Sequence, residues 1–338
     1  MRKETFTRLL WLIGGMATCV VVLAQASTRE NVRAELIRLQ KQSGLSLVSF
    51  GGGGRGGNLY VVMFASRHLA DKQFIKGENA GEGAVSADGK AIAFELRRET
   101  EQTFSTPSGK VFPQYRRYLG IIRQDGSALK EYPELDEPYG LCWSFDEFAL
   151  ALSTKNLNQG KQSTHSLQIL NLDSGTTEEV DAKGYVTTQC WSPDGKQIVY
   201  QVGQIMRVYN IQEKKSWALA EGTGPTWSPD GNWIAFLDGG NYYIIRPSGK
   251  ERKLLFKMKE ALTPLWWSPD SRFVAYIRRD RLFEGSWIPE EQGRLRVRRL
   301  EDNAEDWAAN LFVGHVPSFQ WIKGMAPIVH PEALSQGR

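Results

Sequence analysis

The sequence predicts an all-β protein: a six-bladed β-propeller with four-stranded blades, closed by pairing of its N- and C-terminal strands, with a short N-terminal helix. Three observations support this fold class. One hairpin phrase recurs along the chain, its copies lie at intervals typical of propeller blades, and each interval holds two further strand patterns. The 33 glycines and 11 tryptophans of this 338-residue chain also favour turn-rich β structure with aromatic packing.

The phrase is clearest in CWSPDGKQIVY, which begins at Cys190, and it returns as WSPDGNWIAF from Trp227 and WSPDSRFVAY from Trp267. Within SPDG, proline fixes φ near −65°, aspartate suits the next turn position, and glycine accepts the left-handed conformation that follows. This composition predicts a tight turn between two antiparallel strands. We therefore interpret the aspartate as a turn former rather than a catalyst.

Weaker copies extend the series to six: VSADGKAIAF from Val85, WSFDEFALAL from Trp143, and FQWIKGMAPIVH, which ends at His330. The serines of the first five copies, at positions 86, 144, 192, 228 and 268, are 58, 48, 36 and 40 residues apart. The tryptophans end the first strand of each unit, which favours packing between blades over stacking on a ligand. The residues that carry this structural motif are Trp143, Asp146, Trp191, Asp194, Gly195, Trp227, Asp230, Gly231, Trp267 and Asp270.

The two ends of the chain complement each other. Residues Asn58–Phe74 have the pattern of a third and fourth strand without a hairpin phrase ahead of them, whereas Ser318–His330 have the phrase without strands behind it. We expect the C-terminal segment to give the inner strands of one composite blade and the N-terminal segment, from about Leu45, to give the outer ones. The run GGGGRGG, Gly51–Gly57, lacks the Lys-Ser/Thr end of a phosphate-binding loop, so we expect it to link two of these strands.

The first residues resemble an export signal. A basic start, an apolar run from Leu9 to Leu23 and the small-x-small triplet Ala24-Gln25-Ala26 predict a signal peptide over residues 1–26, with an uncleaved membrane anchor as the alternative. Residues 27–44 are expected to be a short helical linker, with Val32, Leu36 and Leu39 on one face. Residues 45–338 then form the propeller. Export implies a periplasmic or extracellular protein that meets membrane only through an uncleaved N-terminal segment.

The repeated WSPDG phrase followed by an alternating strand resembles the TolB-like, or WD-repeat-like, exported β-propellers. The resemblance covers most of the mature chain, from about Asn58 to His330. It implies a six-bladed propeller, and the best-known member of that family is a periplasmic protein that binds other envelope proteins. That member also has a sizeable N-terminal α/β domain, whereas about 20 residues separate the expected cleavage site from the first strand here. Membership of a Tol-type system is therefore open.

The sequence shows none of the familiar patterns of catalytic chemistry. The four histidines, at positions 68, 165, 315 and 330, have no metal-ligand spacing, and the chain contains no GxSxG elbow. We therefore expect no metal and no cofactor, and from the length of the sequence we expect no peptidase domain beside the propeller. Cys142 and Cys190 occupy equivalent positions in consecutive blades, so we expect buried free thiols that do not face each other. The arginines of RLRVRRL, Arg294–Leu300, are expected on the wet face of a strand.

Two less regular stretches have the composition of a binding surface. These are expected loops at Arg97–Arg117 and Asp280–Gln292, which both follow a second strand and so emerge on the same face of the disc. Exposed aromatic residues with nearby arginines are typical of protein interfaces, although plain long loops would also explain them. The candidate partner-binding residues are Phe104, Phe112, Tyr115, Arg116, Phe283 and Trp287.

The favoured function is an exported, non-catalytic scaffold or recognition module that binds a protein, or an envelope glycan, through one face of the propeller. The alternative is an enzyme, a lyase or hydrolase with a metal in the central channel. Its ligands would have to stand near the starts of first strands, where the chain carries Tyr139, Thr187, Thr223 and Thr263. A third hypothesis is a domain of a larger envelope complex, tethered by the short N-terminal helix. We expect a monomer that does not bind nucleic acid.

Overall fold

The structure is a computed structural model that describes residues 32–52, 56–76, 79–156, 164–180, 186–258, 264–279, 292–312 and 319–322. These residues form one short helix, residues 32–43, and 24 strands, so the all-β prediction is confirmed. Within the described part of the chain, no helix combines the length and the apolar character that crossing a membrane requires.

Sixteen of the strands form four separate sheets of four antiparallel strands each. The first contains β8 (Tyr139–Trp143), β9 (Ala149–Asn156), β10 (Thr164–Asn171) and β11 (Thr177–Val180). The second contains β12 (Val186–Trp191), β13 (Gln197–Val202), β14 (Ile205–Asn210) and β15 (Lys215–Glu221). The third contains β16 (Thr223–Trp227), β17 (Ile234–Asp238), β18 (Asn241–Ile245) and β19 (Lys253–Phe256). The fourth contains β20 (Trp266–Trp267), β21 (Phe273–Arg279), β22 (Gln292–Arg299) and β23 (Glu305–Phe312).

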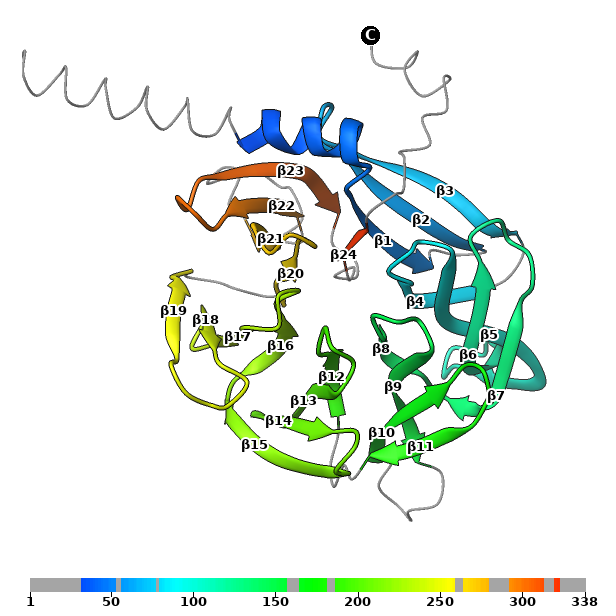
Figure 1. The fold of residues 1–338 in the computed structure, drawn as a ribbon. Helices are drawn as coiled ribbons and strands as arrows, with labels where there is room; N and C mark the ends of the chain where they lie inside the picture. The colour runs from blue at the N-terminus through cyan, green and yellow to red at the C-terminus, as the bar shows by residue number, and fades with distance from the viewer. Residues whose placement is uncertain are drawn as a thin grey trace, which may run out of the picture.

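The remaining strands form one sheet of eight, in the order β3-β2-β1-β4-β5-β6-β7, with β24 also paired to β1. A single residue pair, Phe50 with Gly83, connects β1 to β4 and so joins two groups of four strands. Figure 1 shows the sheets arranged around a common centre, with β8, β12, β16 and β20 innermost. The strands of this sheet are β1 (Ser46–Gly52), β2 (Gly56–Met63), β3 (His68–Lys76), β4 (Asn79–Val85), β5 (Ala91–Ser105), β6 (Val111–Arg123), β7 (Lys130–Asp136) and β24 (Phe319–Ile322).

The two ends of the chain pair in this sheet. Strand β24 runs antiparallel to β1, with Ser46 opposite Ile322 and Ser49 opposite Phe319. The number of strands that each end supplies differs from the prediction. The N-terminal segment supplies three strands, β1 to β3, and the described C-terminal segment supplies one, β24, where the sequence predicted the inner strands from the C-terminal segment. Part of the glycine run lies in strands and not in the expected linking loop, because β1 ends at Gly52 and β2 begins at Gly56. The rest of the predicted C-terminal hairpin lies outside the described residues.

The repeated phrase forms the same turn in five places. In each turn the serine hydroxyl donates to the aspartate carboxylate two residues later, as in Ser192–Asp194 at 2.6 Å. That carboxylate also accepts the backbone N–H two residues further on, as from Lys196 at 3.1 Å. Gly195 has a φ of 69° and donates its N–H to the Ser192 carbonyl at 3.0 Å. The aspartates therefore shape the turns between first and second strands.

The core lies between neighbouring sheets rather than within one. One cluster, for example, packs Ala151 and Leu167 of one sheet against Trp191, Ile198 and Tyr200 of the next, all of them buried. Strand alternation explains this arrangement, because successive side chains point to opposite faces and each sheet is covered on both. Packing against neighbouring sheets thus stabilises the fold.

The helix packs over the place where the chain ends meet, at the upper left of the β1–β3 strands in Figure 1. Val32 and Leu36 are buried in the same cluster as residues of β1, β21 and β24, and Leu39 packs against it, which is the apolar face that the sequence predicted. Glu35 forms ion pairs with Arg272 at 2.6 Å and with Arg299 at 2.8 Å. The helix is therefore a docked part of the fold.

Two details correct the sequence analysis. Cys142 and Cys190 are free thiols, but they are half-buried, and the neighbouring Cys190 thiol together with burial raises the pKa of Cys142 well above its ordinary value. Each thiol donates to the carbonyl of the tryptophan that follows it, Cys142 to Trp143 at 3.7 Å and Cys190 to Trp191 at 3.6 Å. Equivalent positions on converging inner strands therefore bring the thiols together. The arginines of β22 are also not on a wet face, because Arg296 and Arg298 are largely covered and each pairs with Glu305 at 2.6 Å.

Candidate functional site

The longest hairpin of the described chain is formed by β5 and β6. The prediction of an irregular loop at Arg97–Arg117 is wrong, because this segment is mostly strand. Arg97 pairs with Arg117, and Ser105 pairs with Val111. The neighbouring strands are much shorter. Strand β4 accompanies β5 only as far as Arg97, and β7 accompanies β6 only from Tyr118. The outer half of the hairpin is thus a two-stranded ribbon.

The tip of this ribbon uses the same turn chemistry as the repeat. In Thr106-Pro107-Ser108-Gly109 the glycine has a φ of 79° and donates its N–H to the Thr106 carbonyl at 2.9 Å. The N–H of Thr106 then donates to the Lys110 carbonyl at 2.9 Å, which starts the ladder between the two strands. The signal was therefore present in the sequence as TPSG, a variant of the SPDG turn.

Aromatic side chains on this ribbon are exposed to solvent. Phe104 is 49% exposed, Phe112 42% and Tyr115 41%. Phe104 and Phe112 lie opposite each other across the ribbon and stack with their ring centroids 5.6 Å apart. Such a pair stabilises the ribbon but leaves a large apolar area in water, which is typical of a surface that another molecule covers.

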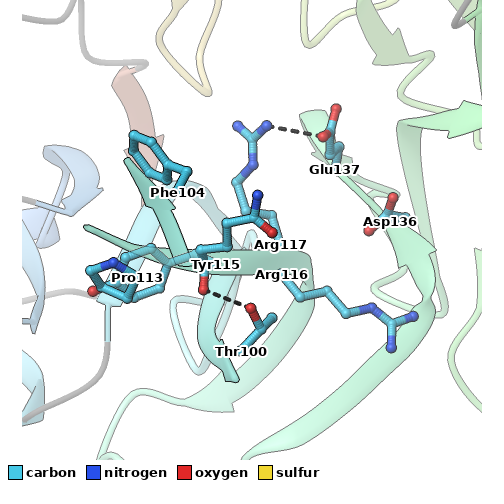
Figure 2. Close-up of a pocket in the computed structure, with 9 residues that line it drawn as sticks. Thr100, Phe104, Pro113, Tyr115, Arg116, Arg117, Asp136 and Glu137 are labelled. Carbon is cyan, nitrogen blue, oxygen red and sulfur yellow. Dashed lines mark hydrogen bonds and ion pairs between the residues drawn. The ribbon is translucent and has the colours of Figure 1, made fainter. Parts of the chain in front are cut away.

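A pocket of about 580 Å³ opens at the base of the ribbon, where β7 ends and leads into β8. Figure 2 shows Phe104 and Arg117 on one side of it and Asp136 and Glu137 on the other. The Thr100 hydroxyl donates to the Gln114 carbonyl at 3.1 Å and closes a bulge in β5. The lining residues are Thr100, Phe104, Pro113, Gln114, Tyr115, Arg116, Arg117, Asp136 and Glu137.

Glu137 is the centre of the charged contacts in the pocket. It pairs with Arg117 at 3.0 Å and with Lys155 at 3.3 Å. Burial alone would raise the pKa of this carboxyl, but the positive charges of Arg117 and Lys155 outweigh burial and lower it. Glu137 also has a φ of 43°, a left-handed conformation that is costly for a residue with a side chain. A network across the β7–β8 connection thus holds this wall of the pocket in place.

Among the described residues, Arg116 forms fewer charged contacts than Arg117. Its guanidinium donates to the Pro133 carbonyl at 2.8 Å and lies 5.8 Å from the centre of the Tyr118 ring, while the side chain is exposed. A guanidinium has five N–H donors, so this group can bind a further acceptor.

Four of the six candidate partner-binding residues meet on this ribbon: Phe104, Phe112, Tyr115 and Arg116. Phe283 and Trp287 lie outside the described residues. The pocket adds three charged residues that the sequence analysis did not select, namely Arg117, Asp136 and Glu137. No local pattern marks the two acidic ones, because only the meeting of the β7–β8 connection with the β5–β6 ribbon makes them part of a site.

Two of the motif tryptophans form hydrogen bonds between neighbouring groups of strands. The indole N–H of Trp143 donates to the Ala84 carbonyl at 3.0 Å, and that of Trp191 to the Cys142 carbonyl at 3.1 Å. Each bond therefore reaches the first strand of the preceding group of strands. The same holds for Trp321, which donates to the Trp266 carbonyl at 2.8 Å.

Among the described residues, no group of three or more histidine, cysteine, aspartate or glutamate side chains could hold a metal ion. Tyr139, Thr187 and Thr223 lie in or next to the starts of first strands, and Thr263 lies outside the described residues.

Comparison with known proteins gives a consistent fold. No family model matches the chain. One curated relative, the uncharacterized peptidase YuxL of Bacillus subtilis (strain 168), is 25% identical over 118 residues, a match that covers 29% of this chain and 18% of that protein. The chain therefore spans less than a fifth of that relative's length.

Solved structures match over most of the chain. Putative TolB from Agrobacterium tumefaciens is 17% identical with a TM-score of 0.56, and the match covers 79% of this chain and 89% of that one. TolB from Acinetobacter baumannii is 14% identical with a TM-score of 0.55, covering 82% of this chain and 66% of that one, so the chain spans just under two thirds of it. An oligogalacturonate lyase in complex with manganese is also similar, with a TM-score of 0.51, 14% identity, and coverage of 79% and 78%. Likeness at these identities shows the fold alone.

Proposed function

Because the chain has the fold of the TolB-like β-propellers, we propose that it is an exported, non-catalytic recognition module that binds a protein partner through the face carrying the β5–β6 ribbon. The observation that carries this proposal is the ribbon itself, which holds exposed aromatic rings beside an arginine-bearing pocket. Aromatic residues and arginine are the residues most enriched at the centres of protein interfaces.

The proposal includes a ring of six four-stranded blades. The sheet of eight divides into β24-β1-β2-β3 and β4-β5-β6-β7, since a single pair joins the two groups. Counted with the four separate sheets, this division would make six blades, and the pairing of β1 with β24 supports closure of the ring. In such a ring, connections between second and third strands emerge on one face. That face would carry the ribbon and the pocket.

Photocrosslinking tests the proposed face. We would place p-benzoylphenylalanine at Phe112 and, as a matched control, at Trp217, an exposed aromatic residue on the outer strand β15. The Phe112 probe is expected to give a discrete protein adduct in cells, and the Trp217 probe is not. A purified partner identified from that adduct should lose affinity for the double variant Phe104→Ala, Phe112→Ala. Equal labelling from both positions, or binding only of a glycan, would refute the protein-recognition proposal.

Export is a separate part of the proposal. It is supported by the basic, apolar and small-x-small pattern of residues 1–26. N-terminal sequencing of the protein from cell fractions is expected to find Ser27 as the first residue in an exported fraction. A chain that begins at Met1 in the membrane fraction would favour the anchored alternative.

Likeness to the manganese-bound lyase keeps a second candidate function in view: a propeller enzyme with a metal in its central channel. The described residues do not offer a ligand set for such a metal, so no reaction step can be assigned to them. Metal analysis of the purified protein tests this candidate. Stoichiometric manganese, calcium or zinc that survives dialysis against a chelator would favour the enzyme.

A further inference from the structure

We propose that the partner engages the ribbon through an extended segment that combines acidic and apolar residues and that adds as a strand to the free edge of β6, at residues 111–115. This inference rests on the proposed function and names the kind of segment that the proposed face binds. Strand addition uses main-chain hydrogen bonds for affinity and side-chain pockets for specificity. Both are present at this edge.

The β6 edge is open where the pocket begins. Strand β7 pairs with β6 at Tyr118–Ile121, and no described strand pairs with residues 111–117 on that side. An added segment would therefore continue the position of β7 in the sheet and lie in the pocket bounded by Asp136 and Glu137 (Figure 2). The opposite edge of the ribbon is less suited to pairing, because β5 carries a bulge between Glu99 and Thr103.

The hydrogen-bond pattern identifies which backbone groups point outward. The Lys110 carbonyl accepts from Thr106 and so points into the ribbon, whereas the Arg117 carbonyl accepts from Glu137 at 2.9 Å and so points away from it. Because N–H and C=O groups alternate in direction along a strand, the odd-numbered residues between them face outward. Val111 and Tyr115 each offer an outward N–H and C=O.

Pro113 also faces outward, between these two residues. It offers a carbonyl but no N–H, and proline in a sheet is confined to positions where its missing donor would face solvent. Its place is therefore consistent with the deduced direction. Its physical effect is to weaken the edge without blocking it, so that the ribbon discourages unspecific pairing.

The charges and the exposed side chains of β6 indicate what kind of segment would pair with its edge. Every charged residue from Lys110 to Arg117 is positive: Lys110, Arg116 and Arg117. Arg117 is already paired with Glu137 at 3.0 Å, whereas Arg116 donates to a backbone carbonyl. Cross-strand pairs of opposite charge stabilise a sheet, so acidic residues in the added strand would pair with Lys110 and Arg116. Val111 and Tyr115 lie on the opposite face of β6 from Lys110 and Arg116, so their exposed side chains would cover apolar residues in the alternate positions of the added strand. A two-stranded ribbon is only marginally stable in water, and a third strand completes it.

Peptide binding to the purified full chain tests the inference. The probes are two fluorescein-labelled hexapeptides, in one of which Glu alternates with Val and in the other Lys alternates with Val, and the measurement is fluorescence anisotropy. The acidic peptide is expected to bind, and the basic one is expected to bind at least about tenfold more weakly. Preference for the basic peptide would overturn the inference.

Three variants separate backbone pairing from side-chain contact. Tyr115→Pro removes both the ring and the outward N–H, and Tyr115→Ala removes the ring alone. We expect Tyr115→Pro to bind about tenfold more weakly than Tyr115→Ala, because a lost main-chain bond to a bound strand costs about that factor. Pro113→Ala restores an outward donor and should tighten binding several-fold. Side-chain recognition alone predicts neither difference.

Hydrogen exchange in the wild-type chain gives a reading that does not depend on any variant folding. Saturation with the acidic peptide should slow exchange of the Val111 and Tyr115 amides and leave the inward-facing Phe112 and Gln114 amides nearly unchanged. Equal affinities of Tyr115→Pro and Tyr115→Ala, or unprotected amides at full saturation, would overturn strand addition. If the Phe112 crosslink to a partner persists in that case, the proposed function stands without it; if the crosslink is also absent, both fail.

Discussion

At the scale of single residues, two repeat turns place a side chain where the others have glycine. Glu147 has a φ of 65° and Ser271 a φ of 56°. Each side chain accepts a backbone N–H from the turn of the preceding sheet, from Asp88 at 2.6 Å and from Asp230 at 3.3 Å respectively. The strained conformation is therefore offset by a bond between neighbouring turns.

Substitution of Glu147 should separate these two effects. Glu147→Ala keeps the positive φ and loses the bond, so we expect a loss of about 1 kcal/mol in the free energy of unfolding. Glu147→Gly also loses the bond but relieves backbone strain of about 1 kcal/mol, so its stability should stay near that of wild type. Urea denaturation measures both variants. An alanine variant as stable as wild type would mean that the bond contributes nothing.

The neighbouring thiols should differ in reactivity. The Cys190 thiol, together with burial, raises the pKa of Cys142, and the Cys142 thiol lowers the pKa of Cys190. The thiolate is the reactive form, so iodoacetamide at pH 8 should label Cys190 before Cys142, as followed by peptide mass spectrometry. Cys142→Ser should slow the labelling of Cys190. The reverse order of labelling would contradict the opposite directions of these two pKa shifts.

The turn aspartates should make the stability of the fold depend on pH in acid solution. Burial would raise the pKa of Asp88, but hydrogen bonds from Lys90 and Ser86 lower it to about 2, and the bond from Ser192 lowers the pKa of Asp194. These carboxyls have lower pKa values in the folded than in the unfolded chain, where aspartate titrates near about 3.9. They therefore stabilise the fold above about pH 4, and this contribution is lost as the pH falls toward about 2.

The melting temperature should accordingly fall between about pH 4 and pH 2. Asp194→Asn keeps an oxygen that accepts the Ser192 hydroxyl but cannot titrate, so its melting temperature should depend less on pH in this window. Differential scanning calorimetry across the range measures both slopes. Identical slopes for the two proteins would show that Asp194 does not contribute to the acid response.

At the scale of elements, the motif tryptophans connect successive first strands unequally. The indole of Trp191 bonds to the Cys142 carbonyl, whereas the buried indole N–H of Trp227 has no partner among the described residues. Both rings are buried, so their packing contributions should be alike. The hydrogen bond is then the difference between them.

This contrast predicts the outcome of two matched substitutions. Trp191→Phe should lower the free energy of unfolding by about 1 kcal/mol more than Trp227→Phe, because the first loses a hydrogen bond between strands and the second removes a donor without a partner among the described residues. Chemical denaturation of the two variants gives the comparison directly. A greater loss in Trp227→Phe would mean that the tryptophans act by packing alone.

At the scale of the whole molecule, one buried cluster joins both ends of the chain. It contains Val32 of the helix, Leu47 of β1, Phe273 of β21 and Phe319 of β24. The ring of Phe319 is fully buried and meets Trp266 edge-on at 5.4 Å. The two ends of the described chain are therefore joined by packing as well as by the pairing of β1 with β24.

Phe319→Ala is expected to destabilise the fold by about 3 to 5 kcal/mol, as for other buried aromatic residues that are cut to alanine. The loss should reach both ends of the chain, so amide exchange should rise in β1 and β20 together. Phe112→Ala, a change on the exposed ribbon, is the matched control and should alter stability by less than about 1 kcal/mol. Increased exchange confined to β24 would show that the ends are not coupled.

The sequence by itself determined the elements whose signal is local and repeated. The SPDG turns, the alternating strands and the apolar face of the helix follow from backbone preferences and side-chain periodicity within a few residues. These signals were enough to predict a propeller and the meeting of its chain ends. The same logic failed at Arg97–Arg117, where polar composition concealed a strand pair that alternation and the TPSG turn could have indicated.

Only the tertiary structure decided the rest, because the remaining contacts join residues that are distant in sequence. The thiols of Cys142 and Cys190 meet because first strands converge near the centre, and Asp136 and Glu137 become part of a pocket because the β7–β8 connection passes the base of the ribbon. The open edge of β6 depends on where β7 stops, and the length of one strand beside another is fixed by packing.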